Sequence, residues 1–165
     1  MLVAEAAFVL IVLAAAASDL IRYRIPNLLV LALAGAFVVW GALHYEETAW
    51  LSHLGAAGLC LVVGFALYQF RQIGAGDVKL LTAVALWTGM SGLLALLLFM
   101  SLSGLFALPL ILLARALVTK AQARNLWKAE WPVPRVLTKK QGVPYGVAIA
   151  LGALVTMVVR PFTLG

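Results

Sequence analysis

The chain has 165 residues, of which 65% are hydrophobic and only 11% are charged, and its mean hydropathy is +1.08. A soluble domain averages about 25% charged residues, so this composition supplies too little polar surface for a water-soluble globule. The net charge of +6 does not indicate nucleic-acid binding, because the basic residues lie between apolar runs rather than among stacking aromatic side chains. The composition therefore predicts an all-α, polytopic membrane protein.

Residues that could bind a metal are few. Cys60 is the only cysteine and lies in an apolar run, so neither a disulfide nor a thiolate metal site is expected. His44 and His53 are the two histidines, and no third ligand stands at metal spacing. The sequence also lacks an H-E-x-x-H motif, a serine nucleophile elbow and a phosphate-binding loop. We therefore expect neither a metal nor a cofactor.

Breaks in the hydropathy predict about six transmembrane helices in a single domain, residues 1–165. The apolar segment 80–114 is too long for one ordinary crossing at about 1.5 Å per residue, although two crossings would be short. We place a turn at "TGMSG", residues 88–92. The predicted spans are 2–19, 27–43, 50–70, 78–90, 92–114 and 143–160.

The positions of lysine and arginine predict the orientation, because these residues concentrate in cytoplasmic loops. With six spans, the loops 19–27, 70–79 and 114–142 share one side and hold 11 of the 12 basic residues. Merging the spans on either side of 88–92 would place the very basic loop 114–142 opposite the other two. We therefore expect both termini outside and the three basic loops in the cytoplasm.

Loop 114–142 is the only sizeable extramembrane segment that the hydropathy predicts. Its stretch "ARNLWKAEWPVPR" combines Trp127 and Trp131 with basic side chains, which suits a short helix or turn at the membrane interface. Anionic lipid headgroups explain this composition at least as well as a partner protein does.

Two of the six acidic residues stand at predicted span boundaries on the basic side. Asp77 begins the fourth span, where an aspartate caps free amide groups, and Gly74 and Gly76 would then simply form a loop. Asp19 ends the first span, where the helix dipole disfavours a negative charge. A salt bridge to Arg22 is the alternative structural explanation for Asp19.

The predicted topology brings Asp19 and Asp77 to the same membrane face at similar depth, and ionisable residues at such positions indicate function. Two close carboxyl groups share one proton because like charges repel, so their pKa values separate. The ionised group can take a proton from water while the neutral group protonates or polarises a substrate carbonyl. Gly74 and Gly76 would let a substrate backbone approach Asp77. This is the chemistry of an aspartic protease.

Three motifs together resemble one family. "GAGDVKLL" at 74–81 is similar to the GxGD motif of intramembrane aspartic proteases, in the extended form found in type IV prepilin peptidases. "SDLIRYRIPN" at 18–27 resembles the region around that family's first catalytic aspartate. "GVPYGVAIALGAL" at 142–154 resembles the last-span motif of the short prepilin peptidases of tight-adherence (Flp-type) pilus systems.

The resemblance implies an endopeptidase with Asp19 and Asp77 as its catalytic residues. The enzyme would remove the short basic leader of membrane-anchored prepilins at the cytoplasmic face of the bacterial inner membrane, in type IV pilus biogenesis and protein secretion. Larger members also carry a cytoplasmic domain with paired Cys-x-x-Cys motifs, and many of those N-methylate the new pilin terminus. With a single cysteine, this chain is not expected to transfer methyl groups.

The last-span motif has two explanations. Its small residues recur every four positions, which favours close helix packing. Alternatively, the backbone of Pro144, Tyr145 and Gly146 holds an extended substrate.

Other functions fit the same two aspartates. A proton-coupled transporter could use them as protonation sites, but six short spans without evident repeats or broken-helix pairs disfavour that function. A non-catalytic assembly factor for the pilus machine and a GxGD protease with other membrane substrates are further alternatives. The basic residues near the pair, Arg22, Arg24 and Lys79, are expected to set topology and contact lipid headgroups, because cations would repel a basic leader.

Overall fold

The computed structural model describes residues 2–124 and 145–159, and all regular structure in them is helical. Helices satisfy every backbone polar group within one segment, which an apolar chain in a lipid environment requires. The described links between helices are short, and Pro26, with φ −60°, stands at the start of the second helix. The helices are α1 (Leu2–Arg22), α2 (Asn27–Leu43), α3 (Trp50–Gln69), α4 (Ala75–Ala123) and α5 (Tyr145–Val159).

The helices support the prediction of an all-helical membrane protein. Three segments are long and apolar enough to cross a membrane: Val3–Arg22, Trp50–Gln69 and Ala75–Ala121. The helices α2 and α5 are apolar but shorter, with 17 and 15 residues. The six-span count and the orientation stay predictions.

The helix α4 is interrupted at Gly89, within the stretch 88–92 where the sequence predicts a turn. Gly89 has φ 62° and ψ −178°, a backbone conformation that is almost restricted to glycine. Without this break, the Met90 amide would donate to the Leu86 carbonyl. Both groups find partners on α3 instead: Met90 N–H donates to Ser52 Oγ at 3.0 Å, and His53 Nδ1 donates to the Leu86 carbonyl at 2.8 Å. The buried His53 therefore has a structural role at the break.

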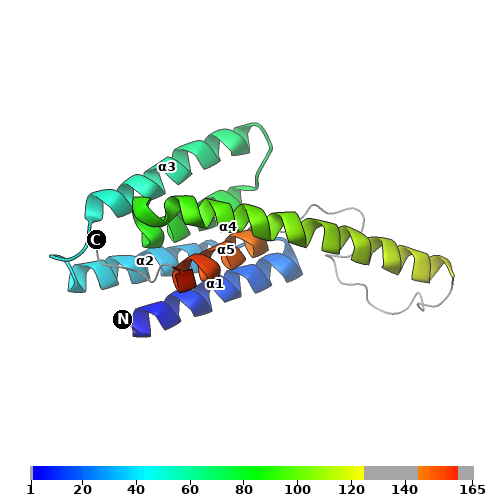
Figure 1. The fold of residues 1–165 in the computed structure, drawn as a ribbon, viewed down its shortest axis with the longest axis horizontal. Helices are drawn as coiled ribbons and strands as arrows, with labels where there is room; N and C mark the ends of the chain where they lie inside the picture. Colours follow the sequence, from blue (N-terminus) through cyan, green and yellow to red (C-terminus); the bar gives the residue numbers. More distant parts are fainter. Residues whose placement is uncertain (1, 125–144, 160–165) are drawn as a thin grey trace.

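The second part of α4 is longer than the sequence predicts. The fifth span is predicted to end at 114 and to be followed by loop 114–142, whereas the helix continues to Ala123, so residues 115–123 are helical and the span boundary stays a prediction. Residues 115–123 are mostly good helix formers, and the fall in hydropathy there ends the apolar run rather than the helix. Figure 1 shows this end of α4 extending well beyond the other helices. Trp127, Trp131 and the rest of the basic loop lie outside the described residues.

The core is built from aromatic side chains and from close helix contacts. Phe8, Phe37 and Trp40 surround Trp87, whose indole N–H donates to the Leu33 carbonyl at 2.9 Å. The helix α5 packs against both α1 and α4 (Figure 1). These contacts place the first turn of α5 beside the last turn of α1, where Asp19 lies.

Candidate active site

Asp19 lies in the last turn of α1, and its carboxylate accepts a hydrogen bond from α5, which is distant in sequence. The carboxylate oxygen Oδ2 accepts a hydrogen bond of 2.9 Å from the backbone N–H of Gly146, the second residue of α5. Asp19 is only 6% exposed. The α1 helix ends three residues later at Arg22, and Tyr23 follows with φ 53°. Asp19 is therefore a buried acid held between two helices.

The alternative explanation for Asp19, a salt bridge to Arg22, is not observed. Within residues 2–124 and 145–159, the partner of its carboxylate is the Gly146 amide, and no ion pair of Asp19 is present. The unfavourable position of a negative charge at the end of α1 is offset by the amino end of α5, where free amides carry positive partial charge.

Asp77 lies in the first turn of α4, which begins at Ala75 rather than at 78. The carbonyl of Gly74 accepts the Val78 amide at 3.1 Å, so Gly74 is the N-cap residue and Asp77 is the third helical residue. The Asp77 carboxylate in turn accepts a backbone hydrogen bond from Gly74. This exchange has the form of half a capping box. The prediction that Asp77 caps its helix is confirmed.

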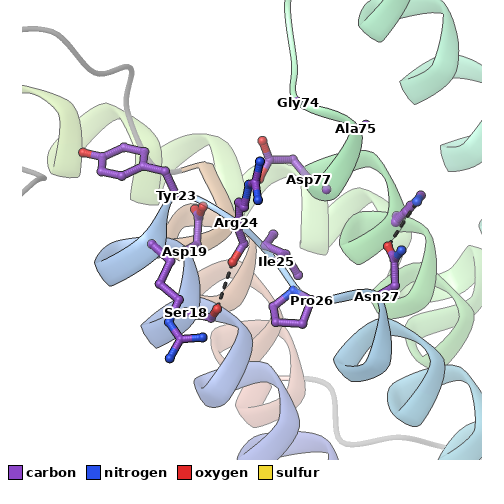
Figure 2. A pocket seen from close by; sticks show the side chains of 13 residues that line it. Ser18, Asp19, Tyr23, Arg24, Ile25, Pro26, Asn27, Gly74, Ala75 and Asp77 are labelled. Carbon is purple, nitrogen blue, oxygen red and sulfur yellow. Dashed lines mark hydrogen bonds between the residues drawn. The ribbon is translucent and has the colours of Figure 1, made fainter.

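The two carboxyl groups lie in one cavity of about 670 Å³ (Figure 2). They are close enough for the charge of Asp19 to act on Asp77. Figure 2 shows Asp77 reaching from α4 toward the segment 23–26, with Asp19 below it on α1. The cavity is lined by Ser18, Asp19, Arg22, Tyr23, Arg24, Ile25, Pro26, Asn27, Gly74, Ala75, Gly76, Asp77 and Lys79.

The short segment between α1 and α2 forms the wall between the two aspartates. Ser18 Oγ donates to the Arg24 carbonyl at 2.8 Å, and Lys79 Nζ donates to Asn27 Oδ1 at 3.1 Å. The side chain of Ile25 lies next to both Gly76 and Gly146. Sequence reasoning did not select Ile25, and its only signal was its place inside the "SDLIRYRIPN" motif.

The structure brings together most of the residues that the sequence selected. Gly74 and Gly76 line the cavity with the two aspartates. Gly146 contacts Asp19, whereas Tyr145, 46% exposed, starts α5, and neither is among the described residues that line the cavity. Pro144 lies outside the described residues. Roles in catalysis and substrate contact stay predictions.

The remaining potential ligands are dispersed. Among the described residues, no three His, Cys, Asp or Glu side chains come together in a way that could hold a metal ion. Cys60 is buried within α3, and His53 is engaged with the Leu86 carbonyl. The chemistry available at the cavity is that of two carboxyl groups, their backbone donors and nearby cations.

Comparison with known proteins finds a family match over the part of the chain that holds the two aspartates. A family model described as the type IV leader peptidase family matches residues 6–112. The matched region contains Asp19, Asp77 and the cavity, and it ends before α5. Comparison with curated proteins and with solved structures finds no match.

Proposed function

Because the chain belongs to the type IV leader peptidase family, we propose that it is a prepilin leader peptidase with Asp19 and Asp77 as its catalytic pair. The family implies aspartic proteolysis in a membrane. The observation that carries the assignment is the presence of both carboxyl groups, far apart in sequence, in one cavity where their charges interact.

The proposed reaction follows from two carboxyl groups that hold one proton between them. The ionised carboxylate takes a proton from water, whose oxygen attacks the carbonyl carbon of the scissile peptide bond. The neutral carboxyl group donates its proton toward the carbonyl oxygen. When the tetrahedral intermediate collapses, the carboxyl group that took the water proton gives it to the leaving nitrogen and the C–N bond breaks. The other carboxylate takes back a hydroxyl proton as the C=O bond re-forms, so the leader ends in a new carboxyl group and the pair again holds one proton. Asp19 Oδ2 already accepts the Gly146 amide, so any proton on Asp19 is carried by Oδ1.

The cavity has the size that this reaction requires. Its volume of about 670 Å³ lies within the range of about 300–1,000 Å³ typical of ligand sites. We propose that an extended segment of a membrane-anchored prepilin enters it beside Gly74 and Gly76. Arg22 and Arg24 are exposed at the rim and suit anionic lipid headgroups better than a basic leader. Their positive charge favours the cytoplasmic face of the membrane. The family match supports the proposal of a bacterial inner membrane and of a role in pilus biogenesis and protein secretion.

The test is cleavage of a co-expressed prepilin by the wild type and by Asp19→Asn and Asp77→Asn, with N-terminal sequencing of the product. Each variant is expected to lower the cleavage rate by about 10²–10⁴-fold or more, since each removes an acid–base group. Glu5→Gln is the matched control, because Glu5 lies in α1 but in its first turn. Full cleavage by either aspartate variant would exclude the two-carboxylate mechanism. Proton flux that depends on the aspartates, without cleavage, would instead indicate a transporter.

A further inference from the structure

We propose that Gly146 is a positioning residue: the amino end of α5 holds the Asp19 carboxylate in place, and glycine is required at 146 because any side chain there would displace that carboxylate. The proposal deepens the proposed function, since it concerns one of the two acids assigned to catalysis. It also assigns α5, which lies outside the region that the family match covers, to the active site.

The hydrogen bond fixes one oxygen of a buried acid. Gly146 is the second residue of α5, where the backbone N–H has no partner within its own helix. Its N–H donates to Asp19 Oδ2 at 2.9 Å, and Asp19 is 6% exposed. A buried acid on α1 and a free amide on α5 therefore satisfy each other. In the proposed reaction, Oδ1 is then the oxygen that exchanges a proton.

The need for glycine is steric. A Cβ at 146 would lie 2.7 Å from Asp19 Oδ2, closer than Cβ atoms approach other atoms, and a tight 3.0 Å from Asp19 Cγ. It would also lie 3.0 Å from Ile25 Cδ1, but that is the end of a side chain that can move. The φ angle of Gly146 is not in the left-handed region, so alanine would not strain the backbone itself. The carboxylate is the group that would have to shift.

The helix α5 is well placed for this role because it packs against α1, which carries Asp19, and against α4, which carries Asp77. Its approach to α4 is close: a Cβ at Gly152 would lie 2.6 Å from the Met100 backbone nitrogen. The amide that holds Asp19 therefore belongs to a helix that also packs against the helix carrying Asp77.

The first measurement is steady-state cleavage of a prepilin by Gly146→Ala. Displacement of Asp19 is expected to lower kcat by at least about tenfold with little change in KM, because the substrate contacts remain. Gly104→Ala is the matched control: this glycine of α4 also faces α5, but its Cβ would make an ordinary 3.9 Å contact with Ala148. It is expected to keep wild-type kcat. Wild-type kcat in Gly146→Ala would overturn the proposal.

The second measurement is thermal unfolding in detergent, which does not depend on catalysis. Gly146→Ala is expected to lower Tm by several degrees in the wild type but to have little effect in an Asp19→Ala background, where no carboxylate stands in the way. If Gly146→Ala does not accumulate as folded protein, the double variant with Asp19→Ala is expected to recover. Equal losses in both backgrounds, or no recovery, would overturn the proposal. This coupling remains measurable even if the aspartates prove not to be catalytic.

Discussion

Asp19 and Asp77 lie in the same cavity, but different parts of the molecule hold them. Asp77 is supported by its own helix start: it accepts a hydrogen bond from Gly74, three residues earlier, and Gly74 accepts one from Val78. Asp19 is supported by Gly146, which is 127 residues away in the chain. A local capping motif survives as long as its helix does, whereas a contact between distant helices depends on the packing of the whole bundle.

This difference predicts contrasting results when each acid is lengthened by one methylene. In Asp77→Glu the capping contact is kept, since glutamate is favoured at the third helical position, so Tm is expected to stay near wild type. In Asp19→Glu the longer side chain has no room beside Gly146, and a loss of about 1–3 kcal/mol in unfolding free energy is expected. Cleavage should fall by about 10²-fold or more in both, because the carboxyl group moves by more than 1 Å.

Thermal unfolding and prepilin cleavage by the two glutamate variants check this contrast. Equal stability of the two variants would show that Asp19 and Asp77 are supported in the same way, and retained cleavage by Asp77→Glu would show that its position in the cavity is not critical.

A second comparison concerns the two glycines that border Ile25. A Cβ at Gly76 would lie 3.5 Å from Ile25 Cβ, an ordinary contact, whereas one at Gly146 would collide with Asp19. Gly76→Ala is therefore expected to leave Tm unchanged. If a substrate backbone approaches at this point, the added methyl group should raise KM severalfold with a smaller change in kcat. An unchanged KM would remove Gly76 from the substrate path.

The break in α4 is also supported by a distant helix, and removing that support is expected to lower the free energy of unfolding. Ser52→Ala removes the acceptor of the Met90 amide, and a loss of about 1 kcal/mol in unfolding free energy is expected. His53→Phe keeps an aromatic ring beside Phe37 but leaves the part-buried Leu86 carbonyl without its donor, at a cost of about 1 kcal/mol.

Ser101→Ala is the control for the break, because the partner of the Ser101 hydroxyl among residues 2–124 and 145–159 is the Leu97 carbonyl of its own helix, and Ser101 is exposed. Unfolding in detergent measures all three variants. If Ser52→Ala and His53→Phe are no less stable than Ser101→Ala, α3 does not support the break at Gly89.

Much of the fold and part of the site followed from the order of residues alone, because those features depend on near neighbours. Hydropathy predicts the helix 27–43 with the bounds that α2 has, and the small, polar stretch 88–92 contains the break at Gly89. The position of Asp77 at a helix start indicates capping, which the structure confirms. Hydropathy predicts the end of the apolar run at 114 but not the end of the helix, since a helix that includes alanine, lysine and glutamine continues to Ala123 after that run stops.

Only the tertiary structure decided which group donates a hydrogen bond to the Asp19 carboxylate, and that α5 supplies it. No local pattern relates Asp19 to Gly146, since the hydrogen bond forms only when α5 packs between α1 and α4. The partner of His53 is likewise set by the tertiary structure. The sequence indicated His53 only as a possible metal ligand that lacked further ligands, whereas its imidazole bonds to the Leu86 carbonyl. Capping and hydropathy depend on a few neighbouring residues, so the sequence alone predicts them. The hydrogen-bond partner of a buried polar group depends instead on which surfaces the fold brings into contact.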